Sequence, residues 1–205
     1  EAEEKIIKVS LGYNHSAAIT NTGKLFTWGE NYYGQLGDGT FDDKNTPTEI
    51  TDKFMLQDAE KVIDVTLGGL HSATITSEGR VFTWGYNWDG ELGDGTIDDK
   101  NTPTEIKYKI IIYRDFLIDF NISFISLGGY HSAAITSDGR VFTWGYNGSG
   151  QLGDGTTKNK NTRTEITDKF ILEDDEIIIE VSLGGYHSAA ITSEGRVFTW
   201  GYNYY

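Results

Sequence analysis

A seven-residue phrase, Leu-Gly-x-x-His-Ser-Ala, occurs four times in the 205-residue sequence. A second phrase, Phe-Thr-Trp-Gly, follows each copy, and both phrases return at intervals of 56, 60 and 56 residues. The repeated side chains are His15, His71, His131 and His187, together with Trp28, Trp84, Trp144 and Trp200. Residues 126–147 and 182–203 differ only at Asp138 and Glu194, which indicates recent duplication. A fixed internal period is typical of repeat architectures, so the four units should share one local structure.

Each unit reads as a set of short strands. The third unit predicts strands at 131–136 and 140–145, joined by a Ser-Asp-Gly turn in which glycine accepts a positive φ at little cost. An apolar run that ends in Leu-Gly-Gly, such as 181–185, predicts the strand that comes first in a unit. A glycine-rich loop, 150–156 in the third unit, leads to a fourth strand, which we expect at 46–50, 102–106 and 162–166.

Large side chains lie on both faces of one predicted strand, as Val81, Phe82 and Trp84 show. Such a strand should be buried on both sides, and four-stranded sheets packed as the blades of a β-propeller meet this requirement. We therefore predict an all-β fold of propeller blades, each with four antiparallel strands, and about four blades in the chain. Proline in the fourth strand predicts a sheet edge. Segments 52–61 and 168–175 are the best helix candidates, but they are short and more typical of extended linkers.

The order of the motifs resembles a known family. Leu-Gly-x-x-His-Ser-Ala is followed by Asp/Glu-Gly-Arg-Val-Phe-Thr-Trp-Gly-x-Asn, then by Gly-Gln-Leu-Gly-Asp-Gly and Thr-Pro. This order is similar to the regulator of chromosome condensation repeat over nearly the whole chain. The resemblance implies a seven-bladed β-propeller, whereas the sequence holds three full repeats and most of a fourth. We expect a single repeat domain, 1–205, that forms a partial or small propeller or part of an oligomeric assembly. Its repeats are 5–60, 61–120, 121–176 and an incomplete 177–205.

Charge and composition exclude several classes of function. The net charge of −14 comes from 17 Lys and Arg against 31 Asp and Glu, and it disfavours nucleic acid as a partner. There is no cysteine, which excludes disulfides, thiolate metal sites and cysteine nucleophiles. No apolar run approaches the roughly 18 residues of a membrane span. We expect an extracellular or cell-surface location rather than a cytoplasmic one.

Two repeated residue types resemble chemical sites. The four histidines could form a metal ring or a set of bases, but duplication copies structural residues automatically, so we expect each to fill the same slot in its blade. Asp38, Asp94 and Asp154 lie in Leu-Gly-Asp-Gly-Thr, where calcium binding is the alternative to capping of the glycine turn. The serine after each histidine lacks a third orienting group. The sequence therefore predicts no enzyme activity, no cofactor and no metal.

Two loop positions vary freely between copies that otherwise match. The pairs are Tyr32-Tyr33, Trp88-Asp89, Gly148-Ser149 and Tyr204-Tyr205. Exposed aromatic clusters mark contact surfaces, so we predict protein binding by Tyr32, Tyr33, Trp88, Tyr204 and Tyr205; neutral drift at a loop tip is the alternative. Segment 107–126 is four residues longer than its counterparts. It is also unusually apolar, with Ile110, Ile111, Ile112, Tyr113, Phe116 and Leu117, and we expect it to pack between blades or against a partner.

These features favour a non-catalytic module for protein–protein interaction or for structural self-assembly. Neither end of the repeat array looks capped, so head-to-tail contact between copies should give a homo-oligomeric ring or a filament. Tyr32, Tyr33, Tyr204 and Tyr205 should then lie near the contact. A single chain closed as a four-blade ring is the competing arrangement. The resemblance implies two other functions, guanine-nucleotide exchange on a small GTPase and inhibition of an enzyme by plugging its active site.

Overall fold

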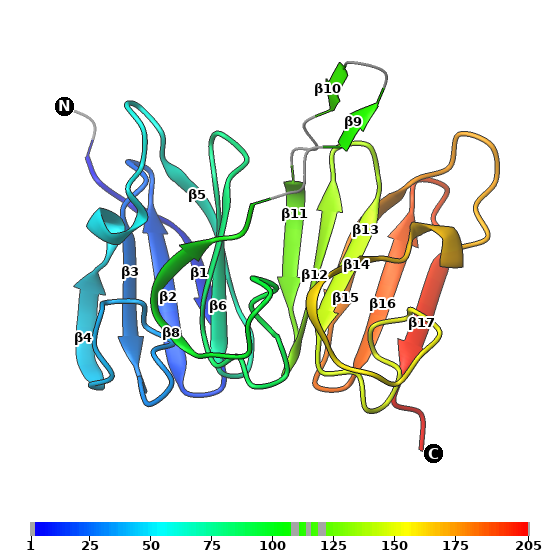
Figure 1. Ribbon diagram of the computed structural model, residues 1–205. Helices are drawn as coiled ribbons and strands as arrows, with labels where there is room; N and C mark the ends of the chain where they lie inside the picture. Colours follow the sequence, from blue (N-terminus) through cyan, green and yellow to red (C-terminus); the bar gives the residue numbers. More distant parts are fainter. Residues whose placement is uncertain (1–2, 108–110, 114–115, 119–121, 205) are drawn as a thin grey trace.

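Antiparallel sheets stand in a row in the computed structural model, which describes residues 3–107, 111–113, 116–118 and 122–204 (Figure 1). The first blade comprises β1 (Ile6–Leu11), β2 (His15–Thr20), β3 (Leu25–Gly29) and β4 (Lys44–Glu49). The second comprises β5 (Val62–Leu67), β6 (His71–Thr76), β7 (Val81–Gly85) and β8 (Lys100–Glu105). The third comprises β11 (Ile122–Leu127), β12 (His131–Thr136), β13 (Val141–Gly145) and β14 (Lys160–Glu165). The fourth has three described strands, β15 (Ile178–Leu183), β16 (His187–Thr192) and β17 (Val197–Gly201). The predicted all-β fold of antiparallel blades is confirmed.

Local sequence explains the strand order within a blade. In the third blade, β12 and β13 pair antiparallel across a turn in which Gly139 has a φ of 82°. The proline-containing strands β4 and β8 lie at the outer edges of their sheets, where a missing N–H breaks no ladder. The fourth strands begin two residues earlier than predicted, because pairing starts where Lys44 lies opposite Gly29 and the corresponding residues pair in the next two blades. Two short 3-10 helices, Thr51–Phe54 and Thr167–Lys169, are the helices of the described residues.

The hydrophobic core lies between consecutive blades. Ala17, Ile19 and Leu25 of the first blade are completely buried, in one cluster with Val62 and Val65 of the second. Equivalent clusters fill the spaces between the second and third blades and between the third and fourth blades. Burial of such apolar area contributes about 25 cal/mol per Å². Each blade therefore depends on the next one for its stability, as in other repeat proteins.

The inner strands meet along a seam of glycines. The amide of Gly69 donates a hydrogen bond to the carbonyl of Gly128 at 3.0 Å, and Gly129 donates to Gly184 at 3.1 Å. A Cβ atom on Gly68 would lie 2.6 Å from the carbonyl oxygen of Gly128. The blades can therefore approach this closely only where side chains are absent.

The first and fourth blades stand at opposite ends of the row (Figure 1). The outward face of the first blade exposes Ile6, Val9 and Leu11. The fourth blade exposes Val197 and leaves Ile191 half-buried. The described arrangement is thus an open row with an apolar face at each end, rather than a closed four-blade ring.

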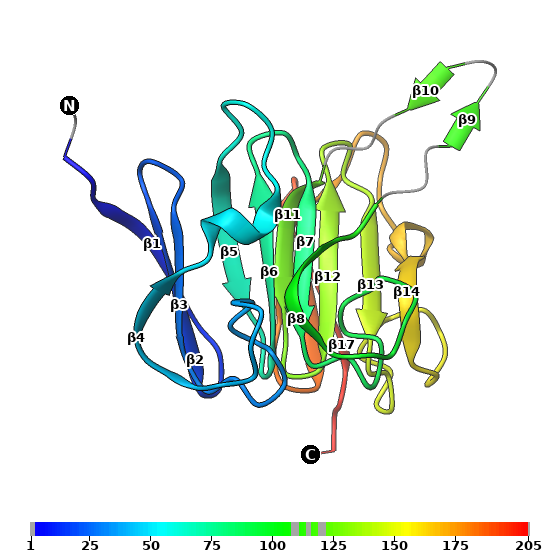
Figure 2. The ribbon, with the colours of Figure 1, turned by 60° about the vertical axis from the view of Figure 1, so that its left-hand side comes forward.

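A two-stranded hairpin interrupts the row between the second and third blades. Its strands, β9 (Ile111–Tyr113) and β10 (Phe116–Ile118), pair antiparallel and project away from the blades at one edge of the row (Figure 2). Ile110 and the side chains of Ile111, Ile112, Tyr113, Phe116 and Leu117 lie outside the described part of the chain. The expectation that this segment packs between blades or on a partner therefore stays a prediction.

We expect Trp84→Ala to lower the free energy of unfolding by about 3–5 kcal/mol, because a fully buried indole would leave a cavity between two blades. Trp88→Ala is the matched control, since this side chain is 68% exposed and its loss should change stability by about 0.5 kcal/mol or less. Urea unfolding followed by circular dichroism measures both variants. Equal destabilisation by the two substitutions would contradict the assignment of the core.

Candidate interaction surface

One backbone carbonyl in each glycine-rich loop joins two blades. The carbonyl oxygen of Gln35 in the first blade accepts hydrogen bonds from Ser72 Oγ at 2.8 Å and Trp84 Nε1 at 2.9 Å. Both donors belong to the second blade. The next two junctions use the same groups, with Ser132 and Trp144 on the Glu91 carbonyl and Ser188 and Trp200 on that of Gln151.

A histidine completes each junction. His15 Nε2 lies 3.0 Å from Ser72 Oγ, and the corresponding distances are 2.9 Å for His71–Ser132 and 2.8 Å for His131–Ser188. Because each serine hydroxyl donates to a carbonyl, the histidine Nε2–H must donate to the serine oxygen. Nδ1 of these three histidines is buried and has no hydrogen-bond partner among the described residues. The histidines therefore belong to the blade junctions, and each requires the neutral form.

Burial keeps these histidines neutral. It lowers the pKa of His15 and of His131 to about 4. Burial, reinforced by His15 and His131 on either side, lowers the pKa of His71 to about 3. At physiological pH the imidazole rings are uncharged hydrogen-bond donors, which is the state that the junction needs.

The end blades depart from the equivalence predicted for the repeated residues. Trp84 and Trp144 are fully buried, whereas Trp28 and Trp200 are only half-buried. His187 is exposed, because the described residues supply no further serine for it to contact. The shared local structure expected of the four units therefore gives equal burial to the two central tryptophans but not to those of the end blades, which each have a described neighbour on one side only.

The repeated aspartates organise the glycine-rich loops. Asp38 Oδ1 accepts hydrogen bonds from the amide of Thr40 at 2.8 Å and from its hydroxyl at 2.7 Å, and Lys44 Nζ lies 3.2 Å from the other carboxylate oxygen. Asp94 and Asp154 make the same contacts in their blades. Nowhere in the described ranges do three or more His, Asp or Glu side chains gather as a metal site requires.

Aromatic side chains gather along one edge of the row, next to the C-terminal ends of β3, β7, β13 and β17. They come from the β1–β2 and β3–β4 loops and from their counterparts in the other blades. We call this set the aromatic face: Tyr13, Tyr32, Tyr33, Tyr86, Trp88, Tyr130, Tyr146, Tyr186, Tyr202 and Tyr204. Six of its members are exposed: Tyr13, Tyr32, Trp88, Tyr186, Tyr202 and Tyr204. A surface of this kind extends over all four blades and is typical of contact with another protein.

The rings of the aromatic face form a connected series. Tyr33 links Tyr32 to Tyr86, with ring centroids 4.9 and 5.0 Å apart. Tyr86 continues to Trp88 at 6.1 Å and to Tyr130 at 6.3 Å. Further pairs at 5.8–6.5 Å are Tyr13–Tyr130, Tyr130–Tyr186, Tyr146–Tyr186, Tyr186–Tyr202 and Tyr202–Tyr204. Edge-to-face and offset contacts at these distances are favourable, so the face is held together by its own rings.

Sequence reasoning found part of this face. Tyr32, Tyr33, Trp88 and Tyr204 all lie in it, although Tyr33 is half-buried, and Tyr205 lies outside the described residues. It missed Tyr13, Tyr86, Tyr130, Tyr146, Tyr186 and Tyr202. Most of these occupy two fixed repeat positions, directly before the histidine and two residues after the tryptophan. Recurrence in every unit does not distinguish a surface residue from a structural one, so the repeat pattern gives no signal for these tyrosines.

Carboxylates surround the first half of the face. Glu91 occupies the loop position that is glutamine in the first and third blades, and burial raises its pKa to about 8. Its Oε2 accepts a hydrogen bond from the amide of Asp89 at 3.0 Å. Burial, together with the charges of Glu91, Asp89 and Asp99, raises the pKa of Tyr86 to about 12. Burial is the larger cause of this shift in the pKa of Tyr86, and the neighbouring carboxyl groups reinforce it.

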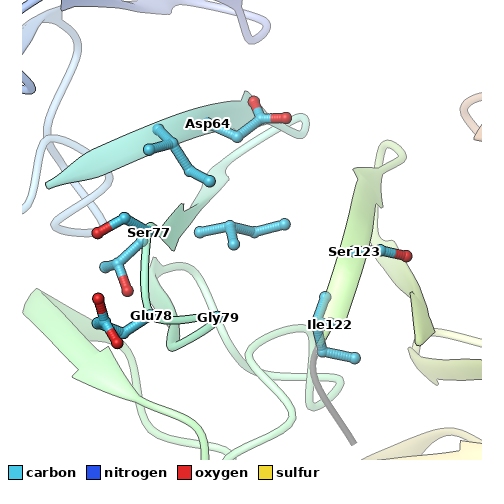
Figure 3. Close-up of a pocket in the computed structure, with 9 residues that line it drawn as sticks. Asp64, Ser77, Glu78, Gly79, Ile122 and Ser123 are labelled. Atoms are coloured by element: carbon cyan, nitrogen blue, oxygen red, sulfur yellow. The ribbon is translucent and has the colours of Figure 1, made fainter. Parts of the chain in front are cut away.

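Two hollows elsewhere among the described residues carry no comparable set of groups. One of about 400 Å³ lies between the second and third blades, where Ser77, Glu78 and Gly79 stand across from Ile122 and Ser123 (Figure 3). A second, of about 190 Å³, lies along the glycine seam. Neither brings together groups suited to catalysis or to metal binding.

These blades, joined through one repeated hydrogen-bond junction, define a repeat protein of the β-propeller class. Residues 22–75, 78–135 and 138–191 match the family model of the Regulator of chromosome condensation (RCC1) repeat, and a second model of this repeat matches 6–35, 122–151 and 178–205. The chain belongs to the RCC1 repeat family, as the resemblance in the sequence predicted. In the described residues, no helix is long and apolar enough to cross a membrane.

Relatives in sequence and structure are much longer proteins. Ultraviolet-B receptor UVR8 of Arabidopsis thaliana is 32% identical over 197 residues, which is 96% of this chain and 41% of the receptor. Probable E3 ubiquitin-protein ligase HERC4 of Homo sapiens is 34% identical over 199 residues, or 17% of its length. The crystal structure of human WBSCR16 has a TM-score of 0.80 at 25% identity, over 98% of this chain and 48% of that one. Yeast RCC1 (Prp20) bound to Kap60 shares the fold, with a TM-score of 0.76 at 24% identity, over 97% of this chain and 44% of that one. The chain thus spans less than half of each of these proteins.

We expect the free energy of unfolding to be greatest near pH 6.5. Below that pH, His15, His71 and His131 become protonated in the unfolded chain but stay neutral in the folded chain. Stability therefore falls as the pH drops towards 4. Glu91 acts in the opposite direction between about pH 4.5 and 8, because over this range it is protonated in the folded chain and ionised in the unfolded chain. Above pH 6.5 the histidines no longer outweigh this effect, so stability falls as the pH rises to 8. Each proton corresponds to about 1.4 kcal/mol per pH unit. Urea titrations over this range measure the profile.

Glu91→Gln separates the two effects. Glutamine occupies the same loop position at Gln35 and Gln151, so it should fit without rearrangement. The variant should lose the decline in stability between pH 6.5 and 8 and should show a steeper decline on the acid side. An unchanged alkaline limb would show that Glu91 does not titrate as described.

Proposed function

We propose that this chain is a non-catalytic module for protein–protein interaction and that the aromatic face is its binding surface. The observation that carries the proposal is the connected series of rings, which runs over four blades and leaves six side chains exposed. Tyrosine and tryptophan supply large contact area at a small cost in conformational entropy, and they dominate binding energy in protein interfaces.

The blade junctions support a non-catalytic role. The histidine and serine side chains that resemble a catalytic pair are bound to each other across blades and to a backbone carbonyl. Yeast RCC1 (Prp20), whose fold this chain shares, has been crystallised with the protein Kap60, which supports a propeller that binds protein. Nucleotide exchange and enzyme inhibition have less support than protein binding, because no described residue favours either of them.

Selection from a random peptide library displayed on phage tests the binding surface. We expect enriched peptides to lose binding to Tyr32→Ser and Trp88→Ser variants of the chain. Met55→Ser is the matched control, since Met55 is 88% exposed and lies outside the aromatic face. Peptides that bind all three variants equally would contradict the proposal, and so would a selection that enriches none.

We also infer that copies of the chain associate head to tail through the open faces of the row. In the second blade, Val62, Val65 and Leu67 of β5 are buried against the first blade. The same repeat positions in β1 are occupied by Ile6, Val9 and Leu11, which are exposed on the first open face. Inside the chain, the β5 residues pack on Ala17, Ile19 and Leu25 of the first blade. In the fourth blade the same repeat positions are occupied by Ala189, Ile191 and Val197, which lie on the second open face. One open face therefore offers the side chains that the other face takes up inside the chain.

Two copies should suffice to close a ring. The chain covers 48% of human WBSCR16, so two chains supply about one such propeller. Two head-to-tail contacts related by a twofold axis leave no apolar face open, whereas a filament leaves one at each end. Tyr33 packs against Tyr86 of the second blade, so Val9 and Val197, which are exposed on the open faces, probe the contact more directly than Tyr33 does.

Light scattering coupled to size-exclusion chromatography tests this association. We expect a particle of about twice the 22.8 kDa chain mass, and monomers for Val9→Glu and for Val197→Glu. An equimolar mixture of these two variants should again form a dimer, because the intact face of one variant meets the intact face of the other. Met55→Glu should not change the mass. A monomeric wild-type chain would refute the inference, and so would a dimer that survives only one of the two substitutions.

A further inference from the structure

We propose that the part of the aromatic face on the first two blades binds a basic segment of its partner, one rich in arginine or lysine. This inference rests on the proposed function, because it names the chemistry of the partner that the aromatic face takes. It depends on two features that coincide on these blades, exposed rings and carboxylates that form no ion pair within the described residues.

The rings offer faces for cations. Trp88 is 68% exposed and stacks on Tyr86 with an interplanar angle of 24°, so the opposite face of its indole is open to solvent. Tyr32 is 71% exposed and packs edge-on against Tyr33. Lysine and arginine bind over the faces of such rings, and tryptophan is the strongest acceptor among them.

Carboxylates lie directly beside these rings. Asp43 accepts a hydrogen bond from the amide of Asn31, the residue before Tyr32, at 2.8 Å. Asp99 accepts one from the amide of Asn87, the residue before Trp88, also at 2.8 Å. Backbone contacts therefore hold both carboxylates at the base of an exposed aromatic side chain. Two more are Glu30, held by Asn14 at 2.7 Å, and Asp89, held by Asn159 at 2.6 Å.

These four carboxylates have no ion-pair partner within the described chain. None of Glu30, Asp43, Asp89 and Asp99 forms an ion pair with a described lysine or arginine. The lysines of the same loops, Lys44 and Lys100, are paired instead with Asp38 and Asp94. A cationic partner supplies the missing charge, and the net charge of −14 steers it towards the chain.

The third blade lacks both features and gives an internal comparison. It has Gly148 and Ser149 where the others have aromatic side chains. Its loop carries Lys158 and Asn159 in place of an aspartate pair, and Asn159 makes the same backbone contact, to the amide of Asn147, at 2.8 Å. The fold therefore does not require an aspartate at this position, so Asp43 and Asp99 carry a charge beyond the needs of the loop.

Titration calorimetry with synthetic decapeptides tests the inference. The probes alternate serine with arginine, lysine, glutamine or glutamate. We expect saturable binding of the arginine and lysine peptides, weakened by salt, and none of the glutamate peptide. Trp88→Leu keeps apolar bulk but removes the indole, and it should weaken binding about fivefold. The double variant Asp43→Asn, Asp99→Asn reproduces the asparagine of the third blade and should weaken binding by a similar factor.

Asp52→Asn is the charge control, because it removes one carboxylate outside the aromatic face. It should leave binding unchanged. Basic peptides that bind the Asp43/Asp99 variant and Trp88→Leu as tightly as the wild-type chain would overturn the inference, and so would equal binding of the glutamate peptide. Library peptides that need Trp88 but contain no basic residue would also overturn it, while leaving the proposed function in place.

Discussion

The hydrogen bonds to one backbone carbonyl in each glycine-rich loop hold the row of blades together. A serine hydroxyl and a tryptophan N–H from the next blade share that oxygen, and a neutral histidine donates to the serine. In the first two junctions all these groups are buried, so loss of any one of them leaves a polar partner unsatisfied. The apolar clusters between blades set how much surface is buried, whereas this junction fixes how one blade is oriented on the next.

The glycines and the aromatic side chains of the repeat follow from the junction. Gly37 has a φ of 72°, and a Cβ at this position would lie 2.7 Å from Nε1 of Trp84, so the loop can present its carbonyl only with glycine there. The segments that follow the tryptophan-containing strands β7, β13 and β17 therefore start at the same end of each blade. Tyr86, Tyr146 and Tyr202 therefore lie in one surface, and the loop that builds the junction also builds the aromatic face.

The sequence predicts most of this fold because the same pattern of strand and turn residues occurs in all four repeat units. Alternation and turn residues place the strands 131–136 and 140–145 almost to the residue, and proline places the fourth strand at an edge. Contacts between units could not be read in the same way. Nothing in the spacing shows that His71 meets Ser132 of the following unit rather than its own Ser72, since that depends on how sheets stack. The aromatic face was likewise only half predictable, because Tyr130 and Tyr186 come together through the curvature of the row.

Each repeat unit carries both halves of the junction. It presents a carbonyl and a histidine to the unit that follows, and a serine and a tryptophan to the unit that precedes it. A newly copied unit therefore fits its neighbours at once, without compensating mutations on either side. Recombination between copies as alike as 126–147 and 182–203 can lengthen or shorten the array in one step. The number of blades can therefore change without any change in the residues that build a single blade.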